Sequence, residues 1–160
     1  MSETIAEQTI QVLTFELGKE VYGIDISSVR EVLEQSNLTK VPQMPAYISG
    51  VINLRGHAVP VVDMNKKFYN KMTEKTVDTC IIITEVTMGE DIVVIGALVD
   101  SVDEVISFDA FNQEPPPKLG SQLKTDFIKC MAKKDEHFAI ILDVNKVFSG
   151  EEIAGISDIS

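Results

Sequence analysis

The stretch HAVPVVDMNKKF (residues 57–68) returns in altered form as HFAIILDVNKVF (residues 137–148), 80 positions further along the chain. An apolar run leads into Asp-x-Asn-Lys in both copies, and five of the twelve positions are identical. A second match, at an offset of 73, joins GIDISSVREVL (residues 23–33) to GALVDSVDEVI (residues 96–106). Two matches in the same order make chance a poor explanation, so we infer an internal duplication.

The two offsets, 73 and 80, differ by seven residues, which places an insertion in the second copy. The expected site of this insertion is QEPPPKLGSQLKTD (residues 113–126), which is rich in turn-forming residues. We therefore expect two similar β units, in sequence halves of roughly 15–80 and 81–148. Each unit is too small to be stable alone, so the two should pack together and create a seam where a partner could bind.

Short apolar stretches bounded by turn residues predict an all-β fold with many strands. The predicted strands cover residues 9–17, 20–26, 51–54, 58–62, 79–86, 91–99, 127–132 and 138–142. Helix signals are brief. Ser27 and Ser28 could cap a helix over SVREVLE (residues 28–34), and Asp63 and Asp143 could each cap a helix of one or two turns.

Composition excludes some classes of function. The 160 residues fit one domain, or two small halves that share a core. A net charge of −11 argues against nucleic-acid binding, which depends on clustered Lys and Arg. The N-terminus lacks a basic segment followed by an apolar one, and no run approaches the roughly 18 apolar residues of a membrane span. We expect a cytoplasmic protein without direct membrane insertion.

Residues that could carry catalysis or bind metal are scattered. Cys80 and Cys130 have apolar neighbours and form no CxxC motif, so we interpret both as small core residues. His57 and His137 lack spaced partner ligands, which makes a zinc site improbable. Neither GxSxG nor a phosphate loop occurs. We expect no catalytic residue, no metal and no cofactor.

Arg55 stands between two apolar runs in GVINLRGHAVPVVDM (residues 50–64). It could be a catalytic electrophile, an anion site, a polar turn residue or a contact for another protein. The second copy has AKKDE where the first has LRG, so the duplicated scaffold requires Arg-Gly only once. This asymmetry and the missing catalytic partner favour a protein contact. The rival hypothesis is a small-molecule-binding or enzymatic β-barrel with Arg55 as an anion clamp.

Four stretches together resemble the CheW family of chemotaxis coupling proteins. They are YGIDISSVREV (residues 22–32), VPQMPAYISGVINLRGHAVPVVDM (41–64), VVIGALVDSVDEVI (93–106) and FAIILDVNKVF (138–148). The likeness spans about residues 9–150. It implies two pseudo-repeated SH3-like five-stranded β-barrel subdomains around a shared core, with short helices. Residues 1–8 and 151–160 are then expected to be flexible tails.

The resemblance implies a non-enzymatic adaptor that joins the regulatory domain of the CheA histidine kinase to the cytoplasmic tip of methyl-accepting chemotaxis receptors. The chain is too short to include a kinase or receiver domain, so a stand-alone coupling protein is expected. It would be a monomer in isolation and part of a ring or array with the kinase, beside polar membrane receptors. A chemosensory array that controls surface motility or cyclic-dinucleotide output is an alternative setting.

The resemblance also implies binding residues. In the family, a receptor helix packs into an apolar groove between the two halves. The matching residues here are Ile26, Val29, Glu31, Val32, Val51, Leu54, Arg55, Gly56, Gly96 and Leu98. For an end-to-end contact with the kinase domain, the predicted residues are Lys40, Pro42, Met44, Ala46 and Tyr47. Because Glu31 and Arg55 belong to the most specific motifs and flank the proposed groove, we predict that they form an ion pair.

Overall fold

The structure is a computed structural model and describes residues 9–34, 37–117 and 126–148. The expected tails lie outside these residues. None of the helices in the described ranges has the length and apolar character needed to cross a membrane. The elements are β1 (Ile10–Leu17), β2 (Glu20–Asp25), η1 (Ile26–Ser28), β3 (Val29–Glu34), β4 (Ile48–Leu54), β5 (His57–Asp63), α2 (Met64–Tyr69), β6 (Cys80–Met88), β7 (Asp91–Val99), β8 (Ser101–Phe108), η2 (Ala110–Asn112), β9 (Gln113–Glu114), β10 (Ile128–Lys134), β11 (His137–Leu142) and α3 (Val144–Val147).

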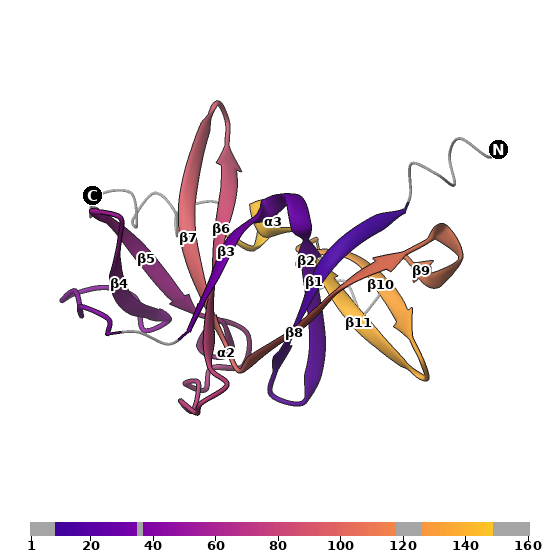
Figure 1. The fold of residues 1–160 in the computed structure, drawn as a ribbon, viewed down its shortest axis with the longest axis horizontal. Helices are drawn as coiled ribbons and strands as arrows, with labels where there is room; N and C mark the ends of the chain where they lie inside the picture. Colours follow the sequence, from indigo (N-terminus) through magenta and orange to yellow (C-terminus); the bar gives the residue numbers. More distant parts are fainter. Residues whose placement is uncertain (1–8, 35–36, 118–125, 149–160) are drawn as a thin grey trace.

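The strands form two sheets that curl into SH3-like half-barrels lying side by side (Figure 1). Barrel B has the strand order β3-β6-β7-β5-β4. Barrel A has the order β8-β1-β2-β11-β10, and the two-residue strand β9 is added at its edge. The five strands follow the same order when the two copies of the sequence repeat are aligned, so the prediction of a duplicated all-β fold is confirmed.

Each barrel contains strands from both copies. Barrel B combines β3, β4 and β5 of the first copy with the β6–β7 hairpin of the second, and barrel A combines the β1–β2 hairpin with β8, β10 and β11. The chain passes between the barrels through η1, which leads from β2 to β3, and again between β7 and β8 (Figure 1). Each barrel is therefore assembled from strands of both copies of the repeat, and neither copy forms a barrel by itself.

The two glycines of the repeat occupy equivalent, crowded positions. In the parallel pairs of the two barrels, Gly23 on β2 lies opposite Ile141 on β11, and Gly96 on β7 lies opposite Val61 on β5. A Cβ atom on Gly23 would stand 2.8 Å from Ile141 Cδ1, and one on Gly96 would stand 2.9 Å from Ile81 Cγ2. A side chain at either position would force a neighbouring isoleucine to shift, so close packing of the strands favours glycine at both.

The predicted helix over residues 28–34 is wrong. Only the single 3-10 turn η1 forms there, with Asp25 rather than Ser27 or Ser28 as its cap, and the following residues form strand β3. The valines fit a strand as well as a helix, and antiparallel pairing with β6 decides the outcome. The caps at Asp63 and Asp143 are confirmed, since their carboxylates accept hydrogen bonds from the first turns of α2 and α3.

Three apolar clusters stabilise this arrangement. One fills barrel A, one fills barrel B, and the largest lies between the sheets, with Phe15 and Ile24 from barrel A against Ile82 and Val86 from barrel B. Cys130 is buried inside barrel A, and Cys80 is partly buried beside the shared core. Burial raises the pKa of both thiols, so both remain protonated and serve as packing residues.

Candidate protein-binding site

The turn between β4 and β5 holds Arg55 in an unfavourable backbone conformation. Arg55 and Gly56 have φ values of 52° and 86°, and both form the central pair of a two-residue hairpin. Such turns favour Asn, Asp or Gly at the first position, because a left-handed conformation costs other L-residues about 1 to 2 kcal/mol. The carbonyl Oδ1 of Asn53 accepts a hydrogen bond from Gly56 N at 2.8 Å and holds the turn closed. Arg55 is thus retained against local preference.

The Arg55 guanidinium pairs with Glu31, as predicted. Nη1 of Arg55 lies 2.7 Å from Oε2 of Glu31, with side chains 71% and 25% exposed respectively. Strands β3 and β4 are at opposite edges of the sheet in barrel B, so this ion pair spans the mouth of the curled barrel. A pair this exposed contributes only about 0 to 1 kcal/mol to folding. The Arg55 side chain is still accessible to a partner, because most of it is exposed.

The segment after β3 closes the barrel and positions the edge strand β4. Thr39 and Val51 exchange backbone hydrogen bonds of 2.9 Å and 2.8 Å. Leu38 and Leu54 pack against the core of barrel B, as does Leu33 of β3. Val51 and Leu54 are both partly buried, and the backbone of Val51 is paired on both sides, with Thr39 and with Pro60 of β5.

Strand β3 divides the predicted groove residues between two faces. Val32 lies opposite Ile82, a residue of the shared core, whereas Glu31 lies opposite Ile83 of the barrel B core. Directly paired residues share a face, so Val32 faces the seam and Glu31 faces the barrel mouth. Ile26 and Val29 also pack against the shared core. Val32, 40% exposed, is an apolar side chain on this seam available to a partner.

Two predicted groove residues do not reach the surface. Leu98 is 2% exposed within the barrel B core, and Gly96 is buried beside it on β7. Both residues are buried on the face of β7 that packs inside barrel B. They can support the site but cannot contact a partner directly.

The residues predicted for the kinase contact gather in the connection between β3 and β4. Lys40, Pro42 and Ala46 are exposed, and Met44 is half-buried. Tyr47 packs against the shared core, and the Lys67 ammonium lies 4.8 Å from the centre of its ring. Four of the five therefore form a contiguous, accessible stretch, and Tyr47 anchors it.

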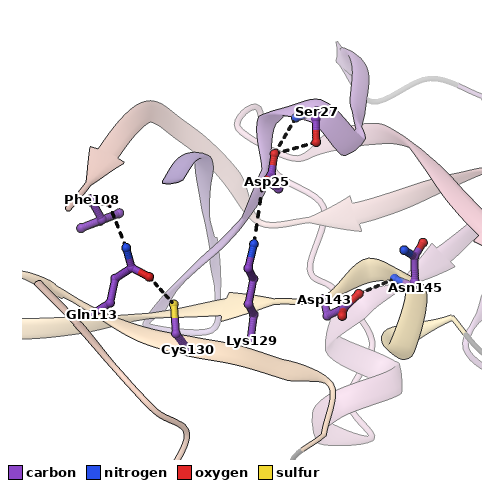
Figure 2. Close-up of polar contacts among 8 residues, drawn as sticks. All are labelled: Asp25, Ser27, Phe108, Gln113, Lys129, Cys130, Asp143 and Asn145. Carbon is purple, nitrogen blue, oxygen red and sulfur yellow. Dashed lines mark hydrogen bonds and ion pairs between the residues drawn. The ribbon is translucent and has the colours of Figure 1, made fainter. Parts of the chain in front are cut away.

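Polar contacts fix the crossing segment that carries Ile26 (Figure 2). Asp25 Oδ1 accepts hydrogen bonds from N and Oγ of Ser27 at 2.9 Å and 2.7 Å, and Lys129 Nζ on β10 lies 3.7 Å from Asp25 Oδ2. Partial burial raises the pKa of Asp25, but the Ser27 donors and the Lys129 charge outweigh burial and lower it overall. The carboxylate therefore stays ionised and ties η1 to barrel A.

The equivalent turn in barrel A carries different charges. Asp135 occupies the Arg55 position with a φ of 58°, and Glu104 occupies the Glu31 position. Two carboxylates cannot form an ion pair. Next to Glu104, burial and then the charge of Glu16 raise the pKa of Asp103, while Lys134 opposes this shift. Barrel A therefore has two acids at the positions where barrel B has the Arg55–Glu31 salt bridge.

Sequence reasoning missed two contributors near this site. Asn53, which closes the Arg55 turn, could have been found from its position two residues before Arg55, because Asn side chains commonly bond the backbone of a nearby turn. Arg30 pairs with Glu85 at 3.0 Å on the neighbouring strand β6. Nothing in the linear sequence brings these two residues together. Within the described ranges, no group of three His, Cys, Asp or Glu side chains could hold a metal ion.

Comparison with known proteins agrees with the fold and the motifs. Residues 11–152 match the CheW-like domain family. The chain is 32% identical to the chemotaxis protein CheW of Klebsiella aerogenes, over 99% of this chain and 91% of that protein, and 31% identical to CheW of Thermotoga maritima, over 94% and 95%.

A solved structure extends the likeness to three dimensions. The scaffolding protein TtCheW from Thermoanaerobacter tengcongensis matches with a TM-score of 0.77 and 37% identity, covering 89% of this chain and 94% of that one. The family match over most of the chain, the relatives above 30% identity and this structural neighbour agree with one another. The chain belongs to the CheW-like family of chemotaxis scaffold proteins, which are not enzymes.

Proposed function

We propose that this protein couples methyl-accepting chemotaxis receptors to the CheA histidine kinase in the cytoplasm. The observation that carries the proposal is Arg55, which occupies a left-handed turn position against local preference and pairs with Glu31 across the mouth of barrel B. The pair adds little to stability because it is exposed, so folding alone does not explain the choice of arginine. A partner that uses the free guanidinium donors does explain it.

The receptor side of the proposal is a helix lying along β3. Ile26 and Val29 pack on the shared core and Val32 faces the same seam, while the Arg55–Glu31 pair lies on the other face of the edge strand β3, at the barrel mouth. An amphipathic helix binds such a seam through apolar side chains spaced three and four residues apart. Arg55 then fixes the orientation of the helix by bonding its polar face.

The kinase side uses the stretch that contains Lys40, Pro42, Met44 and Ala46, with Tyr47 as its anchor. This stretch lies at the β4 end of barrel B and is accessible apart from Tyr47. Because an end-to-end contact is heterologous, alternating copies of scaffold and kinase domain can close into a ring. The protein would reach polar receptor arrays through its receptors. The anion-clamp alternative is less well supported, since Glu31 already pairs with Arg55.

Binding assays with a receptor signalling tip and a CheA regulatory domain test both sides separately. Arg55→Ala should weaken receptor binding about tenfold or more, equivalent to about 1.4 kcal/mol, and leave kinase-domain binding unchanged. The matched control is Lys133→Ala, which removes a half-exposed basic side chain paired with the carboxylate of Glu114 in barrel A and should have little effect on either partner.

A second variant separates binding from folding. Arg55→Asn suits the left-handed turn, so it should preserve or raise the melting temperature while receptor binding falls. Wild-type receptor affinity and kinase activation in both Arg55 variants would refute the role of this residue. Failure of the wild-type protein to bind either partner would reject the coupling function.

A further inference from the structure

The β6–β7 hairpin is longer than its counterpart in the other copy of the repeat. Between Gly23 and the turn, the β1–β2 ladder has three residue pairs, whereas the β6–β7 ladder has five between Gly96 and its turn. The additional pairs are those of residues 87 with 92 and 88 with 91, and this end of the hairpin projects beyond the rest of barrel B (Figure 1). One copy folds without the extension, so the extension, like Arg55, is not a requirement of the scaffold.

The extension is held in place by contacts with the rest of the protein. Thr87 N donates a hydrogen bond of 2.8 Å to Asn145 Oδ1 on α3. Met88 and Val93 pack against the shared core from the opposite face of the hairpin. The position of Ile92 at the end of the ladder is therefore defined, although this residue is 64% exposed.

Ile92 lies on the face of the hairpin that points to the mouth of barrel B. Every second pair of a β ladder shares a face, so Ile92 is on the same face as Val94 and Ile83. Ile83 and Val94 pack in the core of barrel B, and Glu31 lies opposite Ile83 on the neighbouring strand β3. Ile92 is therefore on the same face of the sheet as the ion pair of Glu31 and Arg55.

A second ion pair belongs to this surface. Arg30 Nε lies 3.0 Å from Oε1 of Glu85, which is two residues before Thr87 on β6. The Arg30 and Glu85 side chains are 50% and 35% exposed, compared with 71% for Arg55 and 25% for Glu31. Arg55 is the most exposed of these four charged side chains. A partner at this surface is thus expected to present a carboxylate, which suits the donors of a guanidinium.

The position of the extension fits a helix that lies along β3. The first residue of β3 pairs with Thr84, whereas β6 continues to Met88, so the extension reaches beyond the start of β3. Along β6, Thr87, the partner of Ile92, is four residues from the residue opposite Glu31, which corresponds to about 13 Å. A helix covers this distance in about seven to nine residues.

We propose that Ile92 is an apolar anchor for the receptor helix that binds Arg55, so that the β6–β7 extension determines which helices the protein accepts. This inference rests on the coupling function proposed above. The preferred helix has an acidic residue for Arg55 and an aliphatic side chain for Ile92 about seven to nine residues away. Because one contact is ionic and the other is apolar, the helix can satisfy both in one direction only.

Binding of a receptor signalling tip and of a CheA regulatory domain to variants of the intact chain tests the proposal. Ile92→Ser should weaken binding of the receptor tip about fivefold, with no change in binding of the kinase domain or in melting temperature. Ile92→Val keeps a branched apolar side chain and should bind the tip within about twofold of the wild-type protein. The control is Val77→Ser, which changes an aliphatic residue that is 97% exposed and outside the strands, and should have no effect.

Cross-linking locates the contact directly. The photoreactive residue p-benzoylphenylalanine at position 92 should capture the receptor tip and not the kinase domain, and at position 77 it should capture neither. The proposal is overturned if position 92 does not capture the tip, if Ile92→Ser binds the tip as tightly as the wild-type protein, or if Ile92→Val is as weak as Ile92→Ser. A loss that extends to the kinase domain, or that comes with a lower melting temperature, indicates a structural role and also overturns it.

The same measurements separate this inference from the coupling function. If the wild-type protein binds the receptor tip but Ile92→Ser behaves like Val77→Ser, only the role of Ile92 is rejected. If the wild-type protein does not bind the tip, the coupling function is rejected and the inference with it.

Discussion

Barrel B and barrel A share the order of five strands, but they carry different charged residues at equivalent positions of the β4–β5 and β10–β11 turns and of strands β3 and β8. In barrel B, Arg55 and Glu31 join the two edges of the sheet, and in barrel A the equivalent residues are the acids Asp135 and Glu104. Both turns nevertheless place their first residue in the left-handed conformation. A barrel of this shape therefore folds with either set of side chains, so the salt bridge is a feature of the site and not of the scaffold.

The same comparison identifies what the scaffold does require. Both copies keep a glycine on the strand that forms the parallel pair, at Gly23 and Gly96, and both keep an aspartate cap, at Asp63 and Asp143. The caps are equivalent in sequence but differ in their surroundings. Substituting the equivalent residue in each copy therefore shows whether that residue contributes the same free energy of unfolding in both barrels.

The largest difference is expected between the two caps. Asp63 is buried and accepts hydrogen bonds from Lys66 N and from both N and Oγ1 of Thr73, whereas Asp143 is partly exposed and caps α3 through Asn145 N. Asp63→Ala should cost about 3 kcal/mol, because it leaves several donors without partners, and Asp143→Ala should cost about 1 kcal/mol. Urea denaturation measures both, and equal losses would contradict this account.

A smaller difference is expected between the two glycines. The methyl group of Gly96→Ala would meet Ile81 Cγ2, which is fixed at the branch point of its side chain, whereas that of Gly23→Ala would meet Ile141 Cδ1, at the mobile end. We expect losses in the free energy of unfolding of about 2 kcal/mol for Gly96→Ala and about 1 kcal/mol for Gly23→Ala. A larger loss for Gly23→Ala than for Gly96→Ala would contradict this prediction and would indicate that the barrel A core is the more rigid one.

The smallest effect is expected at Asp103 on strand β8. Because the pKa of Asp103 is raised in the folded protein, ionising this carboxylate penalises the fold above the folded pKa, and the penalty disappears below the unfolded pKa of about 3.8. Asp103→Asn should therefore raise the melting temperature slightly at pH 7 and have no such effect near pH 3. Asp91→Asn, at an exposed hairpin end, is the control. A gain that is the same at both pH values would argue against a titration effect.

Much of the fold followed from the duplication, because repeated apolar runs and caps have few structural interpretations. The ion pair of Arg55 and Glu31 was also predictable from the motifs that contain these two residues. Strand β3 was not, since Val29, Val32 and Leu33 satisfy both a helical and a strand pattern. Pairing with β6, about fifty residues away in sequence, decides between them.

The exchange of strands between copies could not be predicted for a related reason. In a duplicated sequence, the β1–β2 hairpin finds nearly the same partner surface on either copy, so local patterns do not distinguish pairing within a copy from pairing between copies. The different roles of Asn65 and Asn145 could not be predicted either, because the difference lies in their hydrogen-bond partners and not in their identity.

Strand exchange also sets the order in which the protein can be completed during synthesis. The β1–β2 hairpin leaves the ribosome first, but its neighbours are β8 and β11, and the bond from Thr14 Oγ1 to Glu104 O spans 90 residues. All strands of barrel B are present once β7 has emerged, so barrel B can form before β11, the last strand of barrel A, has been synthesised. Folding of barrel A is therefore late and dominated by long-range contacts, which makes it the slow step.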